Sequence, residues 1–106
     1  MNALPEISRS RQALAGQLAA LGHPARIAIV QELAFRDACC CKDVVERLDL
    51  AQSTVSQHLR VLVDAGLVLY EPARPRSRYS LDREAIARLG EAFDGLVSAC
   101  GATPRT

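Results

Sequence analysis

Two short helical patterns separated by a tight turn constrain this chain more than any other feature of its sequence. Apolar residues recur at helical spacing over Lys42–Leu48 and again over Gln52–Ala65, with only three residues between the two stretches. Gly66 follows the second pattern, and glycine commonly ends a helix because it tolerates the left-handed conformation. The segment therefore predicts two helices joined by a tight turn.

A β-hairpin and three outer helices complete the predicted organisation. Leu67–Tyr70 and Arg78–Leu81 favour strands, and Pro72–Ser77 favours the turn between them. Apolar residues at intervals of three, four and seven predict further helices over Pro5–Gly22, Pro24–Phe35 and Asp82 to about Ala99. We expect residues 1–106 to form a single domain, with a frayed tail from about Gly101.

The composition fits one small, mainly helical domain. Of the 106 residues, 49% are hydrophobic, 24% charged and 4% aromatic, which excludes disordered and fibrous chains. No window approaches the roughly 20 apolar residues of a membrane span, and the N-terminus lacks a basic leader, so we expect a cytoplasmic protein with no membrane partner. The net charge of +1 excludes a polybasic tail. The local positive excess lies in residues 51–80, where Arg60, Arg74, Arg76 and Arg78 outnumber Asp64 and Glu71.

The order of helix, tight turn, helix and hairpin is that of a winged helix-turn-helix, a mainly α fold whose second helix enters the major groove of DNA. The faces of the predicted second helix fit this role. On a helical wheel its apolar residues lie on one side and its polar ones opposite: Val55, Leu59, Leu62 and Val63 against Ser53, Ser56, Gln57 and Arg60. Glutamine can pair with adenine through two hydrogen bonds, and arginine can reach guanine or phosphate. The polar face therefore predicts contacts to duplex DNA.

The tip of the predicted hairpin favours DNA binding over the plainer alternative of a solvated amphipathic helix. Arg74, Arg76 and Arg78 alternate there with proline and serine. Side chains at such a tip have no role in a core, and arginines suit contacts to phosphate or to the minor groove. We therefore predict that this wing binds the DNA.

Three stretches of the chain carry a resemblance to a known family. They are LGHPARIAIVQEL at Leu21–Leu33, LAQSTVSQHLRVLVDAGLV at Leu50–Val68 and RYSL at Arg78–Leu81. Together with the outer helices they resemble the ArsR/SmtB family of bacterial metal- and stress-responsive repressors. The resemblance implies a dimeric winged-helix protein that binds operator DNA and leaves it on binding an inducer. It assigns DNA contacts, position by position, to Gln52, Ser53, Ser56 and Gln57.

Two further expectations concern His58 and the outer helices. His58 matches the family's serine, any residue, histidine, leucine pattern, but it lies beside the apolar face of the wheel, so we favour packing or phosphate contact over base contact. The last helix carries a heptad-like seam formed by Ile86, Leu89, Phe93, Leu96 and Cys100. A chain of 106 residues cannot bury this seam and the first-helix stripe internally. We therefore predict a homodimer through the first and last helices, with an ordinary core helix as the alternative.

The cysteine run Cys39–Cys41 is the strongest chemical signal in the chain. Four cysteines in a cytoplasmic protein indicate metal or redox chemistry rather than structural disulfides. The run CCCKDVV resembles the family's cysteine, any residue, cysteine pattern for soft ions such as arsenite, at the start of the helix before the recognition helix. The resemblance implies that Cys39 and Cys41 bind As(III) or another thiophilic ion as the inducer, with no organic cofactor.

The third thiolate of such a site is open between Cys40 and Cys100. Cys40 is nearer, but successive residues of an extended run point to opposite faces. Cys100 requires the last helix of one chain to approach the run. We favour Cys40, and Cys100 suits a packing role equally well.

The cysteines also allow functions other than binding a thiophilic ion. A helix N-terminus beside Arg36 and Lys42 would lower the thiol pKa and favour reaction with peroxide or persulfide, so a redox-sensing repressor is the main alternative. The cysteines could also be small buried residues without a ligand. A zinc site on the last helix is unexpected because that helix has no histidine. We predict no enzyme, since Lys42 stands where the second cysteine of a thioredoxin motif would fall.

Overall fold

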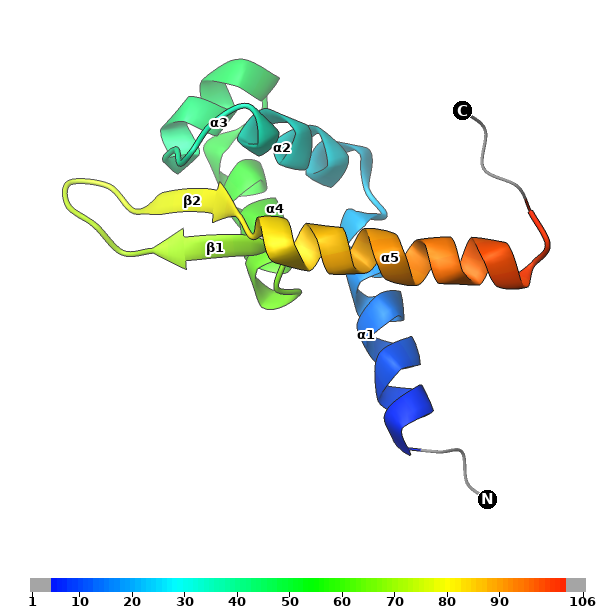
Figure 1. The fold of residues 1–106 in the computed structure, drawn as a ribbon. Coiled ribbons are helices and arrows are strands. Elements are labelled where there is room, and N and C mark those ends of the chain that lie inside the picture. The colour runs from blue at the N-terminus through cyan, green and yellow to red at the C-terminus, as the bar shows by residue number, and fades with distance from the viewer. Residues whose placement is uncertain (1–4, 103–106) are drawn as a thin grey trace.

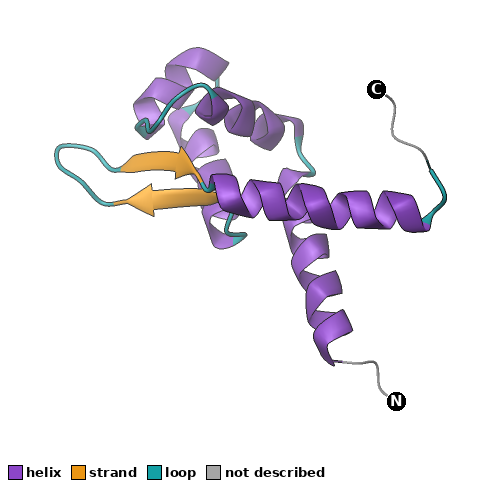
Figure 2. Cartoon of the chain, in the orientation of Figure 1, coloured by secondary structure: helices purple, strands orange, loops and turns teal. Residues whose placement is uncertain are grey.

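The computed structural model describes residues 5–102, with side chains from Arg9 onward. Within those residues the chain forms five helices and one two-stranded hairpin, in the predicted order (Figures 1 and 2). The mainly α fold with a hairpin wing is thus confirmed. Ile7 of the expected first-helix stripe lies outside the described side chains, and the end of the expected tail, residues 103–106, lies outside the described residues.

The first two helices meet at a sharp bend. α1 (Pro5–Leu21) and α2 (Pro24–Ala34) are bent by 92° relative to each other. His23 caps the start of α2: its Nδ1 accepts a hydrogen bond from the backbone N of Ala25 at 3.0 Å. Pro24 suits the first helical position, where no backbone donor is needed. No single helix in residues 5–102 is long and apolar enough to cross a membrane. Only α1 from Arg9 and α2 taken together, as a bent pair, have the necessary length and composition.

The helix-turn-helix consists of α3 (Cys41–Leu48) and α4 (Gln52–Asp64). Asp49 ends α3 in the left-handed conformation at φ 55°, and its backbone N donates to the Val45 carbonyl. Gly66, at φ 79°, turns the chain out of α4, a conformation that glycine adopts without strain. α3 begins one residue earlier than predicted, because Cys40 takes the extended capping conformation.

The wing is an antiparallel hairpin of β1 (Val68–Glu71) and β2 (Arg78–Leu81), in a register that pairs Val68 with Leu81. β1 begins one residue later than predicted. The backbone N of Leu67 donates to the Leu62 carbonyl at 3.0 Å, so Leu67 still belongs to the turn that ends α4. α5 (Arg83–Ala99) follows directly. The Asp82 side chain caps it by accepting a hydrogen bond from the backbone N of Ala85.

One hydrophobic core joins the elements between α2 and the wing. Its largest fully buried side chains are Ile29, Leu33, Leu59, Leu62, Leu67, Val44, Val55 and Val68. The predicted apolar face of α4 is therefore confirmed. α5 contributes buried Ala85 and Leu89 and half-buried Ile86 to this core, while Phe93 and Leu96 are 44% and 47% exposed. Figure 1 shows the second half of α5 extending beyond the rest of the domain, so one chain covers only the first half of the predicted seam.

The buried face of α4 generates a stability prediction. Leu62→Ala should lower the free energy of unfolding by about 2–5 kcal/mol, because it leaves a cavity in the core. Leu69→Ala is the matched control: Leu69 is 51% exposed, whereas Leu62 is fully buried, so its loss should be below about 1 kcal/mol. Urea unfolding followed by circular dichroism, at one protein concentration, measures both. Equal losses would show that α4 does not pack as described.

Candidate DNA interface and thiol segment

The polar face of α4 is exposed, as a DNA-contacting surface must be. All five polar residues expected to contact DNA from this helix, apart from His58, are exposed: Gln52, Ser53, Ser56, Gln57 and Arg60. The opposite face is fixed in the core by Val55, Leu59 and Leu62, which have no exposed surface. The helix can therefore present its polar face without losing its packing.

A groove separates α4 from the wing on this side of the molecule. Its volume is about 400 Å³, and its lining includes Ser56 and Arg60 from α4 together with Tyr70 and Tyr79 from the wing. The two tyrosine rings lie 5.3 Å apart between centroids. The predicted base-contacting face and the wing thus form neighbouring walls of one surface.

The three wing arginines line one cavity with Cys40, and Arg78 makes a further contact with the segment before the cysteines. Arg74, Arg76 and Arg78 are all exposed. Arg78, however, donates from Nη2 to the carbonyl of Ala38 at 3.3 Å, just before the cysteine run. Arg74 and Arg76 belong to the hairpin turn, and the cavity that they line with Arg78 and Cys40 has a volume of about 290 Å³. The wing is therefore in contact with the segment that carries the thiols.

His58 does not share the outward face of its neighbours. It is half-buried, its Nδ1 lies 3.2 Å from Nη1 of Arg26, and its ring centroid lies 4.5 Å from that of His23. Burial lowers the pKa of the imidazole first, and the fields of His23 and Arg26 lower it further. His58 therefore packs against α2, and its expected packing or phosphate role stays a prediction.

Cys39 forms an additional pairing with the wing that the sequence did not predict. Its backbone N donates to the Tyr79 carbonyl at 2.9 Å, and the Tyr79 N donates to the Cys39 carbonyl at 2.8 Å. Its side chain is only 3% exposed and belongs to the core, against which Cys41 also packs. The two thiols matched to the ligand pattern therefore face inward.

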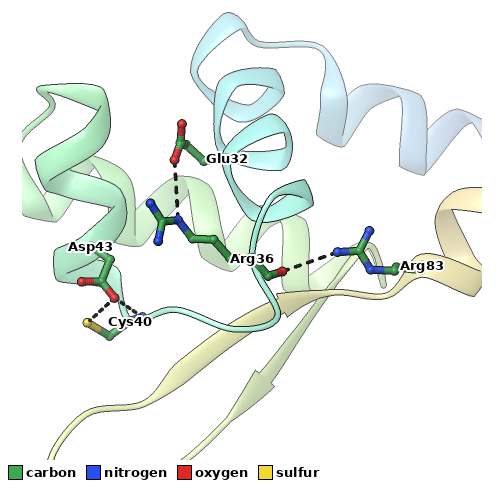
Figure 3. A network of polar contacts seen from close by, with 5 residues as sticks. All are labelled: Glu32, Arg36, Cys40, Asp43 and Arg83. Atoms are coloured by element: carbon green, nitrogen blue, oxygen red, sulfur yellow. Dashed lines mark hydrogen bonds and ion pairs between the residues drawn. The ribbon is translucent and has the colours of Figure 1, made fainter.

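Cys40 occupies the capping position of α3 and is also buried. The Asp43 carboxylate accepts hydrogen bonds from the Cys40 backbone N at 3.3 Å and from the Cys40 thiol at 3.4 Å (Figure 3). These two bonds hold the pKa of Asp43 below its usual value, and Arg36 and Arg76 add smaller favourable fields. Asp43 was missed by the sequence analysis, although its place three residues after the cap is the spacing of a capping box.

The thiol pKa values contradict part of the redox argument. Burial raises the pKa of Cys39, and the nearby Asp43 carboxylate raises it further, outweighing the opposing field of Arg36. Burial, followed by the field of Cys40, raises the pKa of Cys41. The expectation that the helix N-terminus lowers the pKa is therefore wrong for these two thiols, because desolvation of the thiolate dominates.

The loop before the cysteines is fastened from the other side by α5. Arg83 donates from Nη2 to the carbonyl of Ala34 at 3.2 Å and to that of Arg36 at 3.4 Å; Figure 3 shows the second of these bonds. The Arg36 Nε lies 3.8 Å from the Glu32 carboxylate. No sequence pattern singled out Arg83, since a first-turn arginine on a helix suggests only a solvated side chain.

Cys100 lies at the far end of α5 and is exposed. Figure 1 shows that end of α5 on the opposite side of the molecule from α3. Among the described residues, no three histidine, cysteine or acidic side chains lie together in a way that could hold a metal ion. A single chain in this conformation therefore does not present a finished three-thiolate site.

The Asp43 contacts predict a dependence of stability on pH. A carboxylate whose pKa is lowered by folding stabilises the fold above its unfolded pKa of about 3.9, and this contribution disappears as the pH falls through the folded pKa. We expect Asp43→Asn to lower the urea midpoint at pH 7 more than at pH 3. Asp37→Asn, a change to an exposed carboxylate of the same loop, should show a smaller difference. Equal effects of Asp43→Asn at both pH values would exclude the capping role.

Comparison with known proteins gives consistent matches. Residues 21–71 match the model of a helix-turn-helix domain. The chain is 36% identical over 67 residues to an arsenical resistance operon repressor of Bacillus subtilis, covering 63% of this chain and 64% of that protein, just under two thirds of its length. It is 30% identical over 77 residues to an arsenical resistance operon repressor of Staphylococcus xylosus, covering 73% of each.

A solved structure shows the same fold over most of the chain. It is the homodimeric winged helix-turn-helix DNA-binding domain of a possible ArsR-family transcriptional regulator from Mycobacterium bovis. The TM-score is 0.73 at 20% identity, with 92% of this chain and 90% of that one covered. The likeness therefore extends beyond the helix-turn-helix to the outer helices.

Proposed function

Because the chain belongs to the ArsR/SmtB family of winged helix-turn-helix repressors, we propose that it is a sequence-specific, DNA-binding transcriptional repressor of the cytoplasm. It releases its operator when cysteine thiols of the segment Cys39–Cys41 bind As(III) or a similar thiophilic ion. The observation that carries the proposal is the backbone pairing of Cys39 with Tyr79, which places the thiol segment and the DNA-contacting wing in one hydrogen-bonded unit.

The proposed DNA contacts follow from the exposed face of α4. Gln52, Ser53, Ser56 and Gln57 contact base edges in the major groove, and Arg60 reaches guanine or phosphate. Arg74 and Arg76 contact phosphates or the minor groove beside the wing. Arg78 has a second role, because its bond to the Ala38 carbonyl ties the wing to the thiol segment.

The proposed functional unit is a homodimer through α1 and α5. The exposed apolar residues Phe93 and Leu96 continue the seam of α5 beyond the core of one chain, and a second copy would cover them. A two-fold dimer binds a pseudo-palindromic operator whose half-site centres lie about 10 base pairs apart, or a multiple of that.

The proposed coupling rests on the location of Cys39. A ligand shared by Cys39 and Cys41 needs the Cys39 thiol, and that thiol is buried in the core. Bringing it to the surface disturbs the extended backbone that pairs with Tyr79, so ligand binding and the described position of the wing oppose each other. A coupling of about 1–3 kcal/mol, typical of allostery, weakens DNA binding by about 5- to 150-fold.

Cys40 is our preferred third ligand. It adjoins the other two thiols and lines the cavity beneath the wing. Cys100 lies at the far end of α5, so it could join only if a second protomer supplied it. Soft thiolates suit As(III) and related ions, and the trihydroxide of As(III) takes up each thiol proton as water, so raised thiol pKa values do not oppose it.

Titration of a fully reduced protein–DNA complex with arsenite tests this function. A fluorescein-labelled duplex from the region upstream of the gene reports binding by anisotropy. We expect release near one equivalent per protomer, with Cys39→Ser binding DNA but ignoring arsenite. Cys100→Ser is the matched control and should respond as the wild type does.

Normal release of Cys39→Ser by arsenite would overturn the assignment of the thiols. Tight binding that arsenite leaves unchanged, followed by release with peroxide or persulfide, would instead identify a redox-sensing repressor. Absence of salt-sensitive DNA binding would overturn the repressor function itself.

The wing assignment predicts a change in salt dependence. Arg76→Ala should weaken DNA binding by a similar factor on every sequence and reduce the slope of log K against log salt by about 1, because one phosphate contact is lost. Arg9→Ala, an exposed arginine on α1, is the control and should leave the slope unchanged. Anisotropy titrations at several salt concentrations measure both slopes. An unchanged slope for Arg76→Ala would remove this residue from the phosphate contacts.

A further inference from the structure

Three side chains form a polar cluster where α1, α2 and α4 meet, away from the thiols. His58 of α4 is approached by Arg26 of α2, with 3.2 Å between Arg26 Nη1 and His58 Nδ1. The His23 ring, at the start of α2, lies 4.5 Å from the His58 ring. Neither the base contacts nor the thiol response proposed above uses this cluster.

The hydrogen bond between Arg26 and His58 fixes the protonation state of the imidazole. A guanidinium only donates hydrogen bonds, and it stays charged throughout the accessible pH range. Nδ1 of His58 must therefore be the acceptor, which requires a neutral ring with its proton on Nε2. A protonated ring would turn an N–H towards the guanidinium and place two positive charges side by side, so the bond would be lost.

Arg26 also binds the end of α1. Its Nε donates to the carbonyl of Ala20 at 2.6 Å, one residue before α1 ends at Leu21. A cation at the C-terminal end of a helix is favoured by the helix dipole. One guanidinium thus links the last turn of α1, the first turn of α2 and the middle of α4.

The position of His58 on α4 gives this link a consequence for DNA contact. His58 directly follows Gln57 and lies two residues from both Ser56 and Arg60, all of which are exposed on the proposed DNA face. We propose that Arg26 and His58 are positioning residues, which set the orientation of α4 on the body of the domain, and that protonation of His58 releases this link and weakens DNA binding. The inference rests on the DNA-binding function proposed above.

The surroundings of His58 set the direction of the pH effect. The charged and titratable groups whose fields reach it, His23 and Arg26, both come from α2. α1 contributes the Ala20 carbonyl through Arg26, and no acidic side chain of the described residues contributes to the shift. Burial acts first and both fields act with it to lower the pKa. The neutral ring and its bond are therefore present at neutral pH and are lost as the pH falls through the folded pKa.

A direct contact between His58 and phosphate would give the opposite sign. A histidine in contact with phosphate binds it more strongly as a cation, so acid would strengthen DNA binding. A positioning histidine that must be neutral makes acid weaken it. The sign of the pH dependence therefore separates the two roles.

The experiment measures anisotropy of the operator duplex between pH 7.5 and 5.5 at constant ionic strength, without arsenite. Wild-type affinity should fall as the pH is lowered, by up to about tenfold, because one proton taken up by a histidine with an ordinary pKa of about 6.5 cannot change it by more over this range. His58→Gln should show a flat profile, since the amide oxygen can accept the bond from Arg26 and does not titrate. His58→Leu should bind weakly and without pH dependence.

Two controls keep the result interpretable. His23→Asn retains a side chain that can cap α2 and should keep the wild-type pH slope, which assigns the titration to His58. Thermal unfolding at both pH values shows whether each variant is folded. Stronger binding in acid, or an unchanged slope in His58→Gln, would overturn the inference. Failure of the wild type to bind duplex DNA at pH 7.5 would overturn the repressor function instead.

Discussion

The backbone pairing of Cys39 with Tyr79 is the interaction on which the functional half of the molecule depends. It connects residues 40 positions apart and joins the loop after α2 to the wing, with two hydrogen bonds of 2.9 and 2.8 Å. Arg78 and Arg83 fasten the same loop through the carbonyls of Ala34, Arg36 and Ala38. Because the loop leads directly into α3, its position also fixes the start of the helix-turn-helix. In the proposed mechanism this pairing is the shortest route from the thiols to the wing.

Burial governs both the chemistry and the response of the thiols. Cys39 and Cys41 pack with the core, and desolvation raises the pKa of each. Thiols in such a site react slowly with oxidants, since the thiolate is the nucleophile. In the proposed mechanism a ligand must draw Cys39 out of the core, so part of the free energy of ligand binding would go into rearranging the fold. A buried thiol site of this kind would act as a switch, because filling it requires a rearrangement that reaches the wing. A preformed surface site could bind its ligand without moving the wing.

Local patterns predicted most of the fold, because helices and hairpins depend on neighbouring residues. The spacing of Val55, Leu59 and Leu62 correctly identified the buried face of α4, and the boundaries of α3, α4 and β1 were within one residue. The pairing of Cys39 with Tyr79 was missed because backbone hydrogen bonds between distant segments leave no trace in side-chain periodicity. Sequence spacing alone left the directions of the three thiols open, and only the core determines that Cys39 faces inward. The same holds for Arg78, whose bond to the thiol loop depends on where the hairpin folds back.

α4 is thus anchored by two kinds of contact with different sensitivities. Its apolar face is fixed by side chains with no exposed surface, and such packing changes little between pH 5.5 and 7.5 because it involves no titrating group. The bond from Arg26 to His58 is directional and exists only while the imidazole is neutral. Packing therefore decides that the helix stays folded, whereas in our proposal the polar bond influences how its exposed residues are oriented. Base contacts require hydrogen-bond geometry within a few tenths of an ångström, so a small rotation of α4 can weaken DNA binding while leaving the stability of the domain almost unchanged.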